Sequence, residues 1–405
     1  MRILFLTPQM PYPPHQGTQI RNYHLLRAAA SRHRVDLVTF IRPEEGLPRT
    51  SPLQDICGQI WTRPAPTRGQ GARLMAMLTS MDPDLALRLR SDEFAETLRG
   101  VVAGDRYDAV QVAGLEMARY IPAIRAVAPT TKVILDEHNA EYRIQARAAA
   151  VDIRRLWSWH KAFYSFLQYL KLRRYEAWAC RSADLVLAVS GVDAEALRSM
   201  APAARVQVIP NGVDCSQYQA TEQLGEEPPG LLFTGTMDYR PNVDAMQWFV
   251  TEILPRIRVR YPKIPLRIVG RAPTAAVKRL ASATAGVTVT GAVEDVRPFF
   301  AGTPVFVAPI RIAGGARLKI LEAMAMGAPT VSTRIGAEGL DLVDEEELLL
   351  ADSPAEFASA VLRLLEDRAL RKRIARAGRR AVLNRFDWER LAPTLLDVYN
   401  RLTTG

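Results

Sequence analysis

The chain has 405 residues, of which 48% are hydrophobic and 24% are charged, so it has the composition of a soluble globular protein and the length of two domains. Three cysteines without paired spacing suggest a reducing compartment and no disulfide framework, and no Cys/His cluster has the spacing of metal ligands. The net charge of +10 would suit nucleic acid or an anionic membrane, but no nucleic-acid motif of recognised spacing is present, so we expect no nucleic-acid partner.

The N-terminal half reads as a series of strand–helix units. Residues 2–7 predict a buried strand, residues 18–31 a helix and residues 35–40 a second strand, which together make one βα unit of a parallel sheet. Residues 42–75 are rich in Pro, Gly and Arg, and we expect them to be irregular. The other elements expected in this half are helices over 84–102, 144–182 and 190–198 and strands over 109–112, 133–136, 185–189 and 206–209.

The C-terminal half repeats the pattern. Residues 220–230 are polar and contain two prolines, as is typical of an interdomain linker. The elements expected beyond them are strands over 231–236, 266–270, 287–291, 305–309 and 330–333, with helices between them, and a helical tail over 354–402. The sequence therefore predicts two α/β halves, each doubly wound.

Residues 303–340 say most about function. A β-branched strand ends there in a loop with Gly314 and Gly315, and a helix opens near Arg317. Free backbone N–H groups and the helix dipole make such a junction an anion site. Arg317 and Lys319 add positive charge in the first turn, where the dipole disfavours it. A phosphate, rather than helix stability, would require that placement.

Glu322 follows Lys319 by one turn on the same helix face. Its carboxylate could accept hydrogen bonds from the hydroxyl groups of a ligand. A diphosphate beside a polyhydroxyl group suggests a nucleotide sugar. The other interpretation is a buried βαβ helix whose Glu and Lys pair on a solvated face.

The run LEAMA at 321–325 resembles the donor-site signature of the retaining GT-B glycosyltransferases of family 4. In that signature a Glu, seven residues and a second Glu span the loop and the helix. The resemblance implies that Glu322 binds the donor ribose and that the loop residues Gly314, Gly315 and Ala316 contact the donor. The first Glu of the pattern falls on Gly314, so the group that contacts the sugar hydroxyls is left open.

The resemblance covers most of the chain and implies the GT-B arrangement, two Rossmann-like doubly wound domains facing each other across a cleft. An acceptor-side domain would span residues 1–219 and a nucleotide-sugar donor domain residues 231–387, joined by the linker 220–230. In that fold the last helix crosses back onto the first domain, which assigns residues 388–405 to it.

Two further strand ends resemble phosphate sites of the family. Gly17 lies in a loop like the one that many family-4 enzymes place against the donor phosphates, although a tight βα turn would also explain it. Gly235 ends the first strand of the second half, where the family commonly has Arg and Lys nearby. Here Arg240 is the only base, and it could equally be a solvated loop charge. We therefore expect Arg317 and Lys319 to neutralise the leaving diphosphate without a metal.

Two strand ends could hold the nucleobase. Gly270 and Arg271 end one strand, and Val293 lies in the turn 291–295, which the family uses to bind the base through backbone groups. Asp295 is the expected N-cap of a following helix. Any βα turn could have this composition.

Residues 136–141, DEHNAE, form the densest polar cluster after a predicted strand. A solvated loop would explain the charges but would not specially need His138 or Asn139. The family often has a His at a strand end close to the donor sugar and the acceptor. The resemblance therefore implies that His138 is a sugar or acceptor contact.

Residues 154–178 mix aromatic side chains with Lys and Arg. Such a mixture favours an anionic membrane interface, although a long core helix with bases snorkelling outward would share it. The apolar run Ile3–Leu6 is too short for a signal peptide, and no run reaches the roughly 18 apolar residues of a spanning helix. We expect a cytoplasmic protein, with 154–178 as a candidate for docking on the inner face of the cytoplasmic membrane.

The resemblance implies transfer of a sugar from a nucleoside-diphosphate sugar to a hydroxyl of a lipid-linked or polysaccharide acceptor. The reaction would proceed with retention, without a metal and with no cofactor beyond the nucleotide sugar, as in bacterial exopolysaccharide assembly. A non-catalytic nucleotide-sugar-binding or scaffold subunit is the alternative, and the missing acid at Gly314 favours it. A basic nucleic-acid-binding protein is a further rival.

Overall fold

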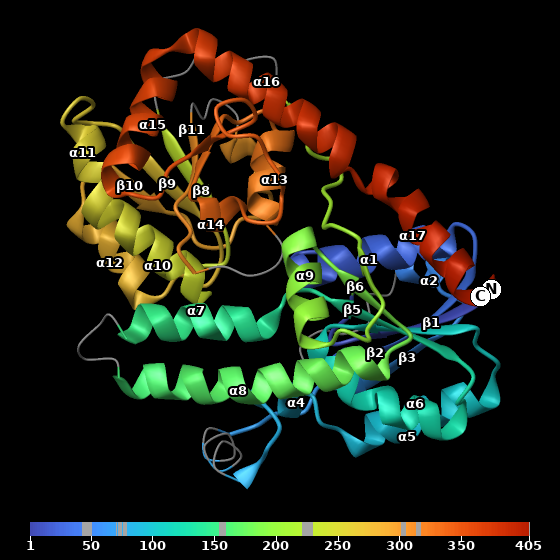
Figure 1. Ribbon diagram of the computed structural model, residues 1–405. Helices are drawn as coiled ribbons and strands as arrows, with labels where there is room; N and C mark the ends of the chain where they lie inside the picture. The colour runs from blue at the N-terminus through green and yellow to red at the C-terminus, as the bar shows by residue number, and fades with distance from the viewer. Residues whose placement is uncertain are drawn as a thin grey trace. The chain divides into compact units, whose positions relative to one another are not determined.

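The computed structural model describes residues 1–42, 51–69, 71, 75, 79–153, 159–220, 230–300, 305–312 and 317–404. They divide into two compact units, each with its own parallel sheet (Figure 1). Unit 1 comprises the described parts of Met1–Pro210 and Leu391–Gly405, and unit 2 those of Asn211–Ala313 and Arg317–Arg390. Most of the predicted linker 220–230 lies outside the described residues.

Unit 1 contains a seven-stranded parallel sheet in the order β3-β2-β1-β4-β5-β6-β7. Its strands are β1 (Arg2–Thr7), β2 (Arg34–Ile41), β3 (Ile60–Pro64), β4 (Ala109–Ala113), β5 (Lys132–Glu137), β6 (Leu185–Ala188) and β7 (Val206–Val208). β1 pairs with β2 on one side, Phe5 opposite Leu37, and with β4 on the other, Leu6 opposite Val112. The direction of winding reverses at this point, which is where open α/β sheets bind ligands.

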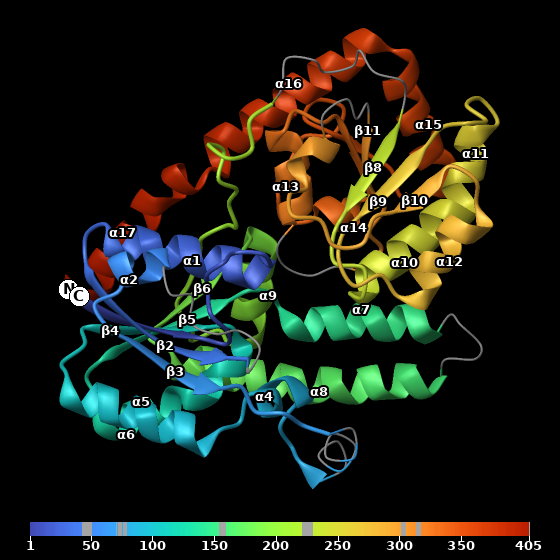
Figure 2. The same cartoon turned by 180° about the vertical axis from the view of Figure 1, so that it is seen from behind.

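Helices cover both faces of this sheet, so its central strands are buried on two sides and are largely apolar. Figures 1 and 2 both show α5 and α6 on one face and α1 on the other. The helical elements of unit 1 are α1 (Gly17–Ala30), α2 (Pro52–Ile56), α4 (Asp84–Arg88), α5 (Asp92–Gly104), the 3-10 turn η1 (Leu115–Tyr120), α6 (Ile121–Val127), α7 (Glu141–Ile153), α8 (Trp159–Ser182) and α9 (Gly191–Met200).

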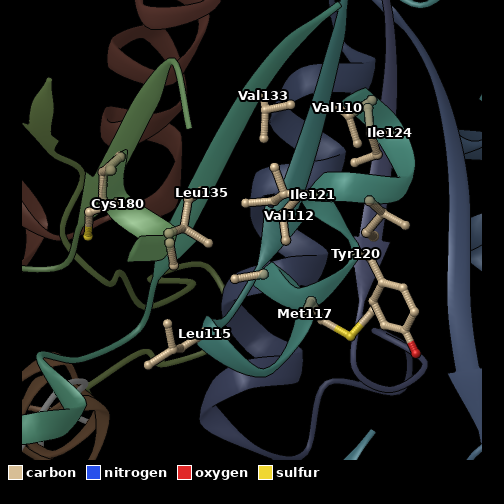
Figure 3. Close-up of a cluster of buried hydrophobic side chains, with 14 of the residues drawn as sticks. Val110, Val112, Leu115, Met117, Tyr120, Ile121, Ile124, Val133, Leu135 and Cys180 are labelled. Atoms are coloured by element: carbon tan, nitrogen blue, oxygen red, sulfur yellow. The ribbon is translucent and has the colours of Figure 1, made fainter. Parts of the chain in front are cut away.

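The main core of unit 1 lies on the α5–α6 face. Val110 and Val112 of β4 and Val133 of β5 point into it, against Ile121 and Ile124 of α6 (Figure 3). Residues two apart on a strand share a face, which is why alternate residues of β4 enter one cluster. Gln111, which lies between Val110 and Val112 on β4, accepts a hydrogen bond from the Tyr399 hydroxyl of α17 (Trp388–Thr404).

Three expectations for unit 1 need correction. Residues 42–75 are not wholly irregular, because α2 and the edge strand β3 form there and β3 pairs with β2. The helix expected over 84–102 is two helices, α4 and α5, and the Ser91 side chain caps the second by accepting the Phe94 N–H. The tract 144–182 is likewise two helices, α7 and α8, which run side by side in both views.

Unit 2 contains a six-stranded parallel sheet in the order β10-β9-β8-β11-β12-β13. Its strands are β8 (Leu231–Thr234), β9 (Leu266–Val269), β10 (Val287–Val289), β11 (Val305–Ala308), β12 (Thr330–Ser332) and β13 (Leu349–Leu350). Its helical elements are α10 (Arg240–Trp248), the π-helical turn η2 (Phe249–Ile253), α11 (Leu254–Arg258), α12 (Ala275–Ala283), the 3-10 turn η3 (Arg297–Phe299), α13 (Leu318–Ala325), α14 (Arg334–Ala337), α15 (Pro354–Glu366) and α16 (Arg368–Arg385).

Alternate residues of β8 pack into two different hydrophobic clusters of unit 2. Leu231 and Phe233 pack with the residues of α10, α11 and α15, whereas Leu232 packs with Leu321 and Met324 of α13. α13 is therefore fixed against the sheet by its apolar face. The prediction of two doubly wound Rossmann-like units is confirmed.

Candidate functional site

Three glycines lie where β8, β9 and β10 end in unit 2. Gly235, Gly270 and Gly291 have φ angles of 151°, 150° and 76°, which side chains rarely adopt. A Cβ on Gly270 would lie 1.8 Å from the carbonyl oxygen of Gly235. A Cβ on Gly235 would lie 2.7 Å from Lys319 Nζ and 2.8 Å from Asn242 Nδ2. The glycines therefore allow the strand ends to meet each other and the lysine closely.

Lys319, in the first turn of α13, extends its ammonium to this strand end. Its Nζ donates to Asn242 Oδ1 at 2.5 Å and lies 4.3 Å from the centroid of the Phe233 ring. Burial lowers the pKa of Lys319 to about 7, with the Glu322 carboxylate opposing the shift and the Arg317 guanidinium adding to it. Among the described residues, no carboxylate forms an ion pair with this ammonium.

Glu322 lies one turn further along α13 and is half-buried. Burial raises its pKa, while a hydrogen bond from Tyr218 and the nearby Lys319 ammonium hold it down. Burial and the same carboxylate raise the pKa of the Tyr218 hydroxyl. Glu322 therefore has a phenol on one side and a cation on the other, and its remaining acceptor capacity can serve ligand hydroxyls.

The two predicted bases at the start of α13 contact different partners. Arg317 is buried and faces α14, where it donates to the Ile335 carbonyl at 3.2 Å and lies 3.7 Å from Glu338. Lys319 faces β8 instead. A shared role for Arg317 and Lys319 at one diphosphate stays a prediction. The loop residues between β11 and α13, Gly314, Gly315 and Ala316, lie outside the described residues.

The other predicted donor residues surround the strand ends. Arg240 opens α10 and is exposed. Arg271 is exposed too, and its carbonyl accepts the Met237 N–H at 2.8 Å. Val293 is half-buried. The structure places these three residues beside β8, β9 and β10, and their contact with a donor stays a prediction.

The helix expected after Asp295 is only the single 3-10 turn η3. Asp295 Oδ1 accepts the Arg297 N–H at 2.9 Å and also receives the Arg297 guanidinium. The acid therefore closes the turn by a local hydrogen bond, which is a common use of aspartate at such positions.

Sequence reasoning missed two residues of this site, Asn242 and Tyr218. Asn242 lies in the first turn of α10, which begins at Arg240. It is buried, and its Nδ2 donates to the Thr236 carbonyl at 2.8 Å. A polar residue shortly after a strand that ends in glycine was the available signal. We see no sequence signal for Tyr218.

A second polar cluster lies at the end of β5 in unit 1. Asp136 is fully buried, and Arg21 of α1 reaches it with Nη2 2.6 Å from Oδ1. Arg21 also donates to the Ile209 carbonyl at 2.9 Å. Burial alone would raise the pKa of Asp136, but Arg21 and His138 outweigh it and lower the pKa to about 2.

His138 lies beside Asp136 of this pair. Its Nε2 is 3.3 Å from Asp136 Oδ2, at ion-pair distance but without the alignment of a hydrogen bond, and its side chain is 15% exposed. Gly17 is the first residue of α1 and is half-buried. Both residues therefore lie at carboxyl ends of the sheet of unit 1, as expected, and their ligand contacts stay predictions.

The remaining acids of the 136–141 cluster are Glu137, which is buried, and Glu141, which is half-buried. Glu137 is buried, and burial together with repulsion from Glu176 raises its pKa well above the usual range. The Glu176 carboxylate accepts the N–H groups of Glu141 and Tyr142 at 2.9 and 3.1 Å, which caps the start of α7. A solvated loop therefore does not explain this cluster.

The aromatic and basic tract at 154–178 divides along its length. Residues 154–158 lie outside the described residues. Further along α8, Tyr175 and Lys171 are buried, and Lys171 donates to the Ser80 carbonyl at 2.8 Å. Phe166 and Leu170 are 53% and 46% exposed. In the described part of the chain, no helix has the length and apolar content to cross a membrane.

Two family models match the chain. Residues 15–217 match the model for Glycosyltransferase Family 4, and residues 228–367 match that for Glycosyl transferases group 1. The first model alone covers half of the chain and includes the cluster around Asp136. The second includes the site around Lys319.

The chain is also similar to individual proteins. It is 22% identical to an uncharacterized 44.6 kDa protein in the cps region of Klebsiella pneumoniae, over 92% of this chain and 93% of that protein. It is 30% identical to a phosphatidyl-myo-inositol mannosyltransferase of Mycobacterium tuberculosis, over 47% of this chain and 53% of the relative. The sucrose-phosphate synthase structure from Thermosynechococcus elongatus matches with a TM-score of 0.76 and 19% identity over all of both chains, which shows a shared fold.

Proposed function

The chain belongs to glycosyltransferase family 4 and has the GT-B fold, and from this premise we propose that it moves a sugar from a nucleoside-diphosphate sugar to an acceptor hydroxyl with retention and without a metal. As a member of this family it is a glycosyltransferase. The observation that carries the proposal is the Lys319 ammonium, which meets the glycine end of β8 with a neutral amide as its partner.

The donor diphosphate would bind at Lys319. The ammonium is partly desolvated and has an amide oxygen and a ring face beside it, so an incoming anion gains more than it would from a cation in water. The absence of a Cβ at Gly235 lets the Lys319 ammonium and the Asn242 amide approach the strand end closely, which keeps the cation at this position. A fixed cation and a helix N-terminus can stabilise a leaving diphosphate, so the reaction would not need a metal.

The donor ribose would bind at Glu322. A carboxylate accepts hydrogen bonds from two neighbouring hydroxyls, and Tyr218 occupies only part of its capacity. Lys319 and Glu322 lie one turn apart on α13, a spacing that matches neighbouring phosphate and ribose groups. Which group contacts the sugar hydroxyls in place of the missing acid at Gly314 is left open.

The acceptor would approach unit 1 at His138. This imidazole lies at a strand end, and its Nε2 is 3.3 Å from Oδ2 of Asp136 in the Arg21–Asp136 pair. A lipid-linked or polysaccharide acceptor is supported by two relatives, one named as a mannosyltransferase of phosphatidyl-myo-inositol and one from a cps region. We propose exopolysaccharide or lipid-linked glycan assembly as the setting.

Attachment to the inner face of an anionic membrane would use α8. Phe166 and Leu170 are exposed there, and Arg173 and Arg174 follow on the same helix face. Apolar side chains beside bases are typical of interfacial attachment.

A non-catalytic nucleotide-sugar-binding or scaffold subunit is the rival function. Incubation of the protein with UDP-, GDP- and ADP-sugars tests the choice, because an enzyme releases nucleoside diphosphate from its donor by slow hydrolysis even without acceptor. The proposal expects turnover with one of them that persists in EDTA. Binding without turnover would support the scaffold, and turnover that EDTA abolishes and magnesium or manganese restores would contradict the metal-free reaction.

A further inference from the structure

Asn242 is buried, and both the NH2 group and the oxygen of its side-chain amide form hydrogen bonds to residues outside α10. It is 5% exposed and is the third residue of α10. Its Nδ2 donates to the Thr236 carbonyl at 2.8 Å, and its Oδ1 accepts from Lys319 Nζ at 2.5 Å. The amide thus connects the loop after β8 to α13, a helix 77 residues later in the chain.

The contact with Thr236 fixes the direction of the amide. A carbonyl can only accept, so the end of Asn242 that meets it must be the NH2 group. The oxygen of Asn242 therefore faces Lys319 and not the reverse. A lysine side chain has four rotatable bonds and is rarely held in one place without such a partner.

Asp244, two residues along the same helix, shows what an acid does in a comparable place. It is buried and holds Arg311 through two bonds of 2.8 and 3.0 Å. The charge of that arginine, whose side chain is 35% exposed, is neutralised by the acid. Asn242 offers Lys319 an oxygen in similar geometry without a negative charge, so the positive charge of the ammonium is not cancelled.

We propose that Asn242 is a positioning residue for the donor, which holds the Lys319 ammonium at the glycine end of β8 and leaves its charge for the diphosphate. The inference rests on the proposed function and deepens it, because it names the residue that sets up the phosphate contact. The charged groups that act on Lys319 are Glu322 of its own helix and Arg317, the residue before that helix, and Tyr218 acts on it only through Glu322.

The exchange Asn242→Asp tests the first half of the inference in the protein without ligand. It keeps the shape of the side chain and places a carboxylate against the ammonium. The measurement is the pH dependence of acetylation of Lys319 by acetic anhydride, followed by mass spectrometry. We expect the midpoint of labelling to rise by about one pH unit or more. An unchanged midpoint in a folded variant would overturn the inference.

Ligand binding tests the second half. UDP, GDP and ADP are titrated calorimetrically beside their nucleosides into the wild type, Asn242→Ala and Asn242→Asp, with the exposed Asn384→Ala as the matched control. We expect both Asn242 variants to bind the diphosphate about tenfold or more weakly, with the nucleoside unchanged, and the control to behave as wild type. Undiminished diphosphate binding by both variants would overturn the inference. A wild type that binds none of the three would instead overturn the proposed function, whatever the labelling shows.

Discussion

Two strand-end clusters, one in each unit, use a cation in opposite ways. At the end of β5, Arg21 meets the carboxylate of Asp136 and a backbone carbonyl, and both side chains are almost wholly buried. At the end of β8, Lys319 meets the neutral amide of Asn242 and the face of Phe233. The first cation is neutralised by the fold, whereas the second is only held in place by it.

The shifts in pKa follow from this difference. The pKa of Asp136 is lowered to about 2, so the pair stays charged at any physiological pH. The pKa of Lys319 is lowered to about 7, so its proton is lost easily unless an anion arrives. The comparison teaches that a paired buried charge supports the structure, while a cation opposite a neutral acceptor is prepared for a ligand.

The largest expected effect comes from breaking the paired cluster. Arg21→Met leaves the Asp136 carboxylate buried without its partner, and we expect it to lower the free energy of unfolding by about 3–5 kcal/mol. Urea denaturation measures this loss. The double variant Arg21→Met/Asp136→Leu should recover most of it, because no isolated charge remains. A loss below about 1 kcal/mol in the single variant would show that the pair is not structural.

The next effect concerns ligand binding rather than stability. Glu322→Ala removes a charge-assisted acceptor for the ribose and should weaken nucleotide binding by about 1.5–3 kcal/mol while the melting temperature changes little. Calorimetric titration with the one of UDP, GDP or ADP that binds the wild type measures it. The exposed Glu389→Ala is the control. Unchanged affinity in Glu322→Ala would remove this residue from the donor site.

A smaller effect is expected from pH. Because the pKa of Lys319 lies near 7, the ammonium that binds phosphate is present below that pH and is lost above it. Affinity for a nucleotide sugar, whose diphosphate does not titrate in this range, should fall about tenfold between pH 6.5 and 8.5. Lys319→Arg, which stays charged, should flatten the profile. A flat profile in the wild type would contradict the assignment.

The free energy of unfolding should change with pH in the opposite direction to the ligand affinity. The folded-state pKa of Lys319 lies below its usual value of 10.5, so the unfolded chain binds more protons between these two pH values. The contribution of Lys319 to the free energy of unfolding therefore rises as pH increases from about 7 to 10.5. Equilibrium unfolding of the wild type and Lys319→Met across this range should show the difference.

The weakest effect is expected at the membrane. Wild type should float with anionic vesicles and less with neutral ones, and Arg173→Gln/Arg174→Gln should reduce flotation, since each base contributes about 1 kcal/mol near an anionic surface. Arg376→Gln/Arg380→Gln makes the same charge change on exposed positions of α16 and is the matched control. If the wild type remains in solution with anionic vesicles, α8 does not dock.

The sequence predicted the central strands, which have helices packed on both faces of their sheet. The strands at 2–7 and 231–234 contain the apolar runs 3–6 and 231–233, because helices bury both sides of each sheet. β3 was missed because it is an edge strand, half-exposed and containing Arg63 and Pro64. β13 has only two residues, too few to show any periodicity.

In the candidate site, residues marked by local sequence patterns could be predicted, whereas contacts between distant parts of the chain could not. Lys319 and Gly235 were predicted from helix and strand ends, and the structure brings them together. The direction of Arg317 could not be predicted, because it depends on partners in α14. Arg21 finds Asp136 across 115 residues of sequence, a contact that no local pattern encodes.

The measurement that tests the account most directly compares Lys319→Gln with the wild type in titrations of UDP, GDP and ADP and of their nucleosides. The variant keeps a long polar side chain that can still contact Asn242, but it removes the charge. The account predicts that the diphosphate binds at least about tenfold more weakly, the nucleoside as before, and the fold stays intact. Equal binding of the diphosphate by both proteins, or equal weakening of diphosphate and nucleoside, would contradict it.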